Sequence, residues 1–138
     1  SNGVELDASY AFGPWSISGA YNFADPEVKG SGLTGLRPAQ IAQHQGNLTL
    51  GWTGARGLQA SLTGRYVSSQ FDDDQNTRRL SSATALDAYF SAPLREGLKL
   101  ELRGENVTNV SIEAGRAANG VIEEASPRTL WIGLRYTM

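Results

Sequence analysis

Few residues of this chain have the type and spacing that chemistry requires. The chain has one histidine, His44, and no cysteine, so a cluster of His and Cys metal ligands cannot form. The run Asp72-Asp73-Asp74 could suggest a calcium site, but it lacks the alternating oxygen ligands and the glycine of an EF-hand loop. We therefore interpret His44 as a solvated loop histidine and the acidic run as a solvated loop tip, and we expect no metal and no cofactor.

Carboxylates also occur in close pairs, which acid–base catalysis would need if both members shared one pocket. Glu5 and Asp7 are two residues apart, and Glu101 and Glu105 are four residues apart. On a β-strand both spacings simply place two side chains on the same face. Because no nucleophile with an adjacent base is evident either, the sequence predicts that the protein is not an enzyme.

The composition limits which partners and which kinds of membrane contact are expected. The chain has 138 residues, a formal net charge of −2 and no basic run, so nucleic acid is not an expected partner. No stretch of about 18 apolar residues is present, which argues against a transmembrane helix. A membrane contact would have to come from strands, whose apolar residues occur at every second position.

Alternating apolar and polar residues predict β-strands along most of the chain. Between Leu58 and Tyr66, for example, every second residue is apolar or glycine and those between are polar. The pattern predicts seven strands, at Val4–Phe12, Trp15–Phe23, Asn47–Thr53, Leu58–Ser69, Ser81–Ser91, Leu98–Val107 and Arg128–Met138. We expect an all-β fold, an antiparallel up-and-down meander without crossover helices. Residues 24–45 lack the alternation and are predicted to be a loop, with one or two helical turns within Arg37–Gln45.

The connections between these strands alternate in length. Short turns at 13–14, 54–57 and 92–97 follow the odd-numbered strands, and long loops at 24–45, 70–80 and 108–127 follow the even-numbered ones. In a meander, this places all the short turns at one end of the sheet and all the long loops at the other. Such asymmetry is typical of outer-membrane barrels.

Aromatic side chains lie at both ends of the apolar face. Phe12, Trp15, Trp52 and Phe90 are next to the short turns, and Tyr21, Phe23 and Tyr66 are next to the long loops. With Tyr136 of the final strand, these rings are predicted to form girdles at two membrane–water interfaces, where a ring is half-buried. A soluble sandwich would instead place its largest rings in the middle of its core.

The opposite face carries the charges of the strands. The residues predicted to line a water-filled lumen are Glu5, Asp7, Arg65, Asp87, Lys99, Glu101, Arg103, Glu105 and Arg135. Several strands also reach the roughly 9–11 residues that a tilted strand needs to cross a bilayer. The pattern therefore favours part of a larger transmembrane β-barrel over a soluble sandwich, since only a closed barrel pairs every backbone group in hydrocarbon.

The C-terminal residues resemble those of TonB-dependent outer-membrane receptors. The stretch Leu98–Asn109 looks like the penultimate strand of that family, which ends in an Asn-aliphatic-x-Asn corner, and Pro127–Tyr136 is similar to its last strand. The resemblance covers essentially the whole chain. It implies that residues 1–138 are the C-terminal portion of a barrel of about 22 strands, with the plug and the earlier strands outside this sequence. Met138 stands where the family usually has an aromatic residue.

The resemblance also implies a function and partners. The parent would take up a scarce ligand such as a ferric siderophore, cobalamin or an oligosaccharide across the bacterial outer membrane, energised by the TonB complex through the plug. The ligand would contact the three long loops, and lipid would contact the apolar face. Because a few strands cannot close so large a barrel, the isolated fragment is expected to self-associate through its open edges.

Two other classes stay open at this point. A small self-contained porin-like barrel would need an even number of strands, so it is disfavoured unless a further strand lies within 24–45. A soluble carbohydrate-binding β-sandwich could use Trp15, Trp52 and Trp131 as stacking rings, although the first two lie on the leucine-bearing face.

Overall fold

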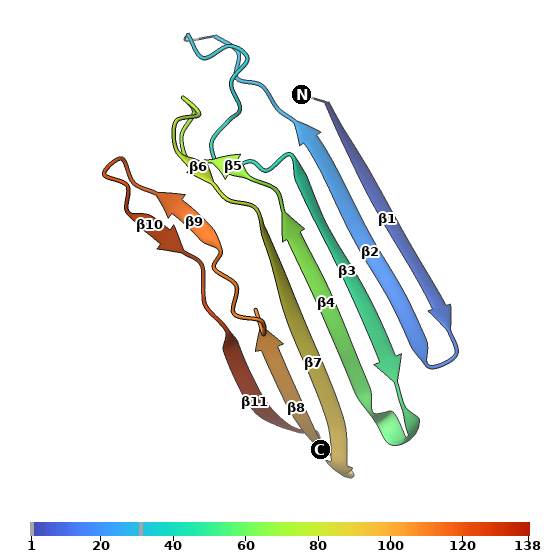
Figure 1. Cartoon of the computed structure of the whole chain (residues 1–138). Coiled ribbons are helices and arrows are strands. Elements are labelled where there is room, and N and C mark those ends of the chain that lie inside the picture. The colour runs from blue at the N-terminus through green and yellow to red at the C-terminus, as the bar shows by residue number, and fades with distance from the viewer. Residues whose placement is uncertain (1, 31) are drawn as a thin grey trace.

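The computed structural model describes residues 2–30 and 32–138, which form one large antiparallel sheet (Figure 1). Its seven strands in spatial order are β1 (Asn2–Phe12), β2 (Trp15–Asp25), β3 (His44–Thr53), β4 (Gln59–Val67), β7 (Ala83–Arg95), β8 (Leu98–Glu105) and β11 (Thr129–Tyr136). The predicted all-β, up-and-down meander of about seven strands is confirmed.

The connections have the predicted asymmetry. In Figure 1 the short turns lie at the end of the sheet where the chain finishes, and the long loops lie at the end where it begins. The β1–β2 turn uses Gly13 at a φ of 56°, a left-handed conformation that glycine adopts at little cost. A short 3₁₀ turn, η1 (Ala55–Gly57), joins β3 to β4.

Strand β7 extends further than the sequence predicts. The expected turn at 92–97 is wrong, because β7 continues to Arg95 and only Glu96 and Gly97 form the turn. Pro93 therefore lies inside a strand, where it cannot donate a ladder hydrogen bond. The register with β8 shifts between Pro93 and Arg95, so this proline sits at a bulge, one of the few places in a sheet that accept it.

The long loops contain structure of their own. Two short hairpins occur there: β5 (Gln70–Phe71) pairs with β6 (Arg79–Leu80), and β9 (Glu113–Arg116) pairs with β10 (Ile122–Glu124). The helical turns expected within Arg37–Gln45 are wrong. The backbone amides of Arg37, Ala39 and Gln40 donate to residues 71–76 of the next loop instead of to a helix.

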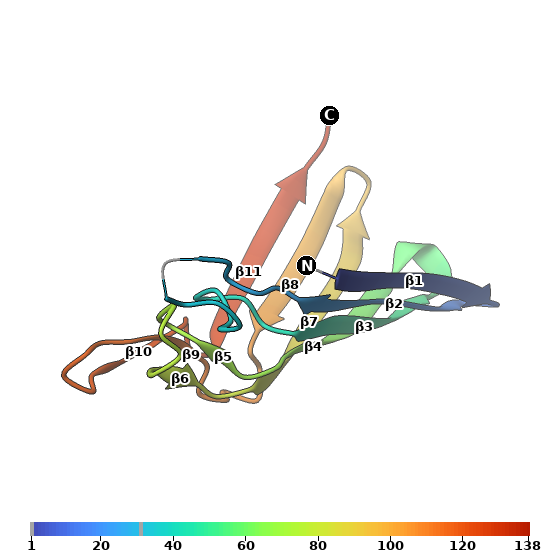
Figure 2. The ribbon, with the colours of Figure 1, turned by 90° about the horizontal axis from the view of Figure 1, so that it is seen from above.

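Neither face of the sheet is covered over most of its length. Figure 2 shows a curved, twisted sheet with the β9–β10 hairpin reaching away from it. On the apolar face, Leu6, Leu130 and Ile132 are 62%, 69% and 78% exposed. Buried apolar residues such as Leu80 and Ala85 lie at the long-loop end. No second layer packs on this sheet within residues 2–30 and 32–138, which does not fit the β-sandwich alternative.

No helix in the described part of the chain is long and apolar enough to cross a membrane.

Candidate functional site

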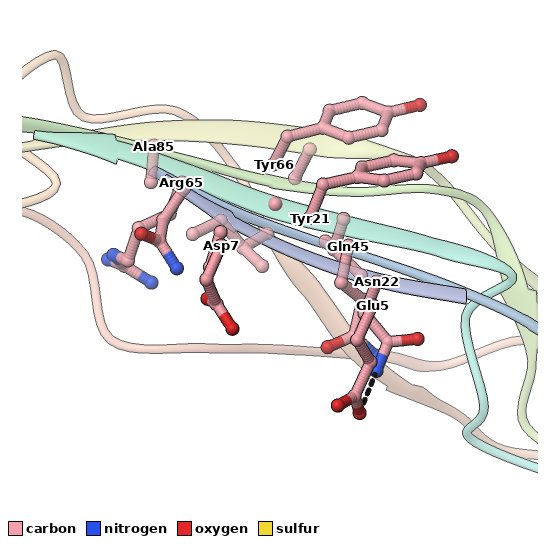
Figure 3. Close-up of a pocket in the computed structure, with 14 residues that line it drawn as sticks. Glu5, Asp7, Tyr21, Asn22, Gln45, Arg65, Tyr66 and Ala85 are labelled. Atoms are coloured by element: carbon pink, nitrogen blue, oxygen red, sulfur yellow. Dashed lines mark hydrogen bonds between the residues drawn. The ribbon is translucent and has the colours of Figure 1, made fainter. Parts of the chain in front are cut away.

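The two faces of the sheet carry different side chains. Figure 3 shows the side chains of Tyr21 and Tyr66 on one side of the sheet and those of Glu5, Asp7 and Arg65 on the other. Residues of this part of the sheet line a concavity of about 530 Å³. We call the side of Glu5 the polar face. By strand register, it also bears the other residues predicted to line a lumen, namely Asp87, Lys99, Glu101, Arg103, Glu105 and Arg135.

One strong ion pair crosses from β4 to β7 on the polar face. Arg65 donates from Nε and from one terminal nitrogen to the two carboxylate oxygens of Asp87, at 2.5 and 3.0 Å. Asp87 also accepts the backbone amide of Asn106 at 3.0 Å. This bidentate geometry fixes both side chains against the wall, and it ties two strands to the corner that follows β8.

A second group of charges lies on β8 and β11. Glu101 is 3.8 Å from the ammonium of Lys99, 3.7 Å from Nε of Arg135 and 3.4 Å from the hydroxyl of Tyr89. The guanidinium of Arg103 lies over the Trp131 ring, 4.6 Å from its centroid. The charges of the polar face are therefore largely engaged with one another or with rings, which suits a hydrated wall better than a reaction centre.

The aromatic residues predicted for the membrane interfaces all project from the other face, here called the apolar face. Near the short turns, the register sets Phe12 opposite Trp15, and Trp15 opposite Trp52, with Phe90 in the same lateral row beyond Ala60. Tyr136, at the same end, is opposite Leu98. Near the long loops the corresponding rings are those of Tyr21, Phe23 and Tyr66.

His44 belongs to this second aromatic group, so its assignment to a solvated loop is wrong. It is the first residue of β3 and lies directly opposite Phe23, with the ring centroids 5.1 Å apart. The Tyr21 hydroxyl is 2.6 Å from its Nδ1. Because β3 pairs with β2 as far as His44, this residue belongs to the strand and not to the loop. No set of three or more His, Cys, Asp or Glu residues in the described chain is arranged to hold a metal ion.

The Asn-Val-Thr-Asn corner after β8 is built by its two asparagines. Asn106 and Asn109 have φ values of 49° and 55°, in the left-handed region that asparagine tolerates better than most residues. The side chain of Asn106, only 2% exposed, donates to the Val110 carbonyl and accepts the Val110 amide. Asn109 accepts the amide of Arg128 at 2.9 Å. The corner thus fixes both ends of the last long loop.

The acidic run is not a solvated tip, which corrects the sequence interpretation. Asp73 is 5% exposed and accepts hydrogen bonds from the Thr77 amide, the Thr77 hydroxyl and the Arg78 amide. Burial alone would raise its pKa, but these hydrogen bonds outweigh burial and lower it. Asp73 therefore acts as an internal cap that closes the turn 73–78.

Asp72 and Asp74 reach other loops. Asp72 accepts the side-chain amide of Gln40 at 2.7 Å and the backbone amide of Arg116 at 2.8 Å, and these two bonds lower its pKa. Asp74 accepts the Ala39 amide at 2.8 Å. The pattern Asp73-x-x-Asn76-Thr77 indicates the turn, since Asp and Asn favour such turns. The sequence contains no signal for the partners of Asp72 and Asp74 in other loops.

The chain matches known proteins in sequence and in fold. A family model described as TonB dependent receptor-like, beta-barrel, matches residues 1–110. The ferrichrome outer membrane transporter and phage receptor of Escherichia coli K12 is 29% identical over 113 residues, which cover 78% of this chain and 15% of that protein.

Two solved structures share the fold over 97% of this chain. The ferric yersiniabactin uptake receptor of Yersinia pestis has a TM-score of 0.86 at 22% identity, and this chain covers 23% of it. A siderophore receptor of Acinetobacter baumannii has a TM-score of 0.82 at 19% identity, with 21% covered. The chain therefore spans less than a quarter of each protein described here.

These findings agree with the structure, which has a meander sheet, an exposed apolar face, a charged opposite face and long loops at one end. The family model covers residues 1–110, which is most of the chain, and together with these relatives it confirms the predicted resemblance to this family. The chain belongs to the TonB-dependent receptor β-barrel family, whose members are receptors and transporters of the bacterial outer membrane and not enzymes.

Proposed function

We propose that this chain is the C-terminal part of the barrel of an outer-membrane transporter that takes up a scarce ligand, such as a ferric siderophore, with energy from TonB. The observation that carries the proposal is the contrast between the two faces of a single sheet. One face exposes leucine, isoleucine and aromatic side chains, and the other holds a network of paired charges. The names of relatives, which refer to ferrichrome and to ferric yersiniabactin, support an iron-bearing ligand.

Each face then has a role in the parent protein. The polar face lines the lumen, where Arg65, Asp87 and Glu101 stay hydrated or paired and support the wall around the plug. The apolar face contacts outer-membrane lipid, with rings at both membrane interfaces. The TonB complex acts through the plug of the parent, and the long loops, at the outer end, meet the ligand.

Uptake by whole cells tests this function. A strain without its own copy of the complete receptor is grown under iron limitation, supplied with that receptor, and offered radiolabelled ferric siderophores, cobalamin and an oligosaccharide in turn. We expect accumulation of at least one ferric siderophore, and only in cells with active TonB. Uptake that continues unchanged after TonB is inactivated would favour the porin-like alternative, and no uptake of any ligand in the panel would contradict the proposal.

The isolated chain has its own expected behaviour. Strands β1 and β11 are both open edges, and the apolar face has no cover within the described residues. We propose that the isolated fragment self-associates, because open edges and bare apolar surface both favour pairing with another copy. Size-exclusion chromatography with light scattering, with and without detergent, measures this. A compact monomer of the same size in both conditions would contradict it.

A further inference from the structure

The three long loops are connected through the middle one. We name them by the strands they join: loop 1 between β2 and β3, loop 2 between β4 and β7, and loop 3 between β8 and β11. Asp72 of loop 2 accepts a hydrogen bond from loop 1 on one oxygen, from Gln40 Nε2 at 2.7 Å, and from loop 3 on the other, from the Arg116 amide at 2.8 Å. Among the described residues, no hydrogen bond joins loop 1 directly to loop 3.

Loop 1 is fixed to loop 2 at several further points. Asn76 accepts the Arg37 amide at 2.9 Å and donates to the Arg37 carbonyl at 2.7 Å, a reciprocal pair. The Gln40 amide donates to the Phe71 carbonyl at 2.6 Å, and the Arg37 guanidinium lies 4.9 Å from the centre of the Phe71 ring. These contacts leave loop 1 little freedom to move without loop 2.

Loop 3 has fewer contacts with loop 2, and they too are hydrogen bonds from a backbone amide to a carboxylate. The Ser81 amide of loop 2 donates to Glu113 at 2.6 Å, which adds a second carboxylate bond next to that of Asp72. Loop 2 also has contacts within itself, since Asp73 closes its turn and Leu80 is fully buried. A rigid middle loop can transmit a displacement from one neighbour to the other.

We propose that the three loops open and close as one cooperative body, with the two oxygens of Asp72 as the joint between loop 1 and loop 3. This proposal rests on the proposed function only in treating the three loops as the part of the receptor that meets the ligand. Its consequence is that a contact made on loop 1 changes the opening of loop 3, although the two loops are separated by loop 2.

Amide hydrogen exchange on the full-length receptor, without ligand, tests the joint. Asp72→Ala removes both acceptor oxygens, so the bonds from Gln40 and from Arg116 are both lost. Asp74→Asn is the matched control: it changes the charge equally, but Asp74 uses only one oxygen, which asparagine keeps. We expect exchange in loops 1 and 3 to rise about three- to tenfold in Asp72→Ala and to stay unchanged in Asp74→Asn. Equal effects of the two variants would overturn the proposal.

A second variant, which changes no residue of loop 2, tests whether a change in loop 1 reaches loop 3. The Gln40 side chain bonds to Asp72 and to no residue of loop 3 in the described structure. We expect Gln40→Ala to speed exchange of loop 3 amides such as that of Arg116, as well as those of loop 1. An effect confined to loop 1 would mean that the loops open independently. Because no ligand is present, this result stands apart from the uptake experiment, and either proposal can fail alone.

Discussion

At the scale of single residues, the acids of this chain show how position decides what a carboxylate does. Asp87 holds an arginine on the wall of the sheet, Asp73 closes a turn, and Asp72 joins two loops. In the sequence, Asp72 and Asp73 are simply neighbours in an acidic run. Their roles could not be predicted from the sequence. The partners of Asp72, Gln40 and Arg116, lie 32 and 44 residues away from it, and the residues next to Asp72 do not indicate such distant contacts.

The loop carboxylates predict a dependence on acid. The pKa of Asp72 is lowered chiefly by the bond from Gln40, and that of Glu113 by the amide of Ser81. A lowered folded pKa means that the stabilisation is complete above the ordinary values of 3.8 and 4.5 and is lost as the pH falls through the lowered ones. We expect the loops to stay protected from amide exchange between pH 7 and about 5 and to open only below the ordinary carboxyl range.

The measurement is amide exchange, corrected for the intrinsic effect of pH, on loop 2 and on the middle of β4. The strand serves as the control, since its protection comes from ladder hydrogen bonds without carboxylates. Loss of loop protection between pH 5 and 7 would point to groups other than these acids.

At the scale of elements, the two-residue period was a sufficient guide wherever a strand is regular. It located all seven long strands, because a strand with one apolar and one polar face has apolar and polar residues in alternation. It failed where other forces decide. Pro93 resembles a turn signal but occupies a bulge, and Arg37–Gln45 has helical composition but gives its amides to a neighbouring loop.

The β7–β8 turn gives a prediction at this scale. Gly97 has a φ of 73°, and a Cβ there would lie 2.6 Å from the Thr137 carbonyl oxygen, whereas Gly13 has a φ of 56° with nothing within 4 Å of its Cβ position. Both alanine variants bear a backbone cost of about 1–2 kcal/mol. Gly97→Ala must also displace the end of β11, whose Thr137 amide donates to the Gly97 carbonyl at 2.8 Å.

We therefore expect Gly97→Ala to destabilise the full-length receptor clearly more than Gly13→Ala does. Denaturant unfolding of both variants in the same detergent compares their free energies. Equal losses would show that the contact of Gly97 with the last strand is not kept in the complete barrel.

At the scale of the whole molecule, the described structure is a single open sheet and not a globular domain with a central core. The residues that a soluble domain would gather in its core, such as Leu62, Leu134 and Ile132, stand exposed on the apolar face at 43%, 66% and 78%. The apolar face and the loop asymmetry were visible in the sequence, because both arise from regular strands. The joining of the loops was not, because it depends on how the strands place distant loops next to one another.

Leu62 allows a direct test of what covers this face. It lies mid-strand on β4, opposite Leu50 and Ala88, while its neighbour Ser61 projects from the polar face. Arginine in place of a lipid-facing residue near the bilayer midplane costs about 2–4 kcal/mol, and arginine on a lumen wall costs far less. We expect Leu62→Arg to lower the stability of the full-length receptor in lipid by that amount and Ser61→Arg to change it little, as measured by denaturant unfolding in vesicles. If water covered the apolar face, the partly exposed Leu62 would accept arginine within about 0.5 kcal/mol, so equal tolerance of the two variants would contradict lipid contact.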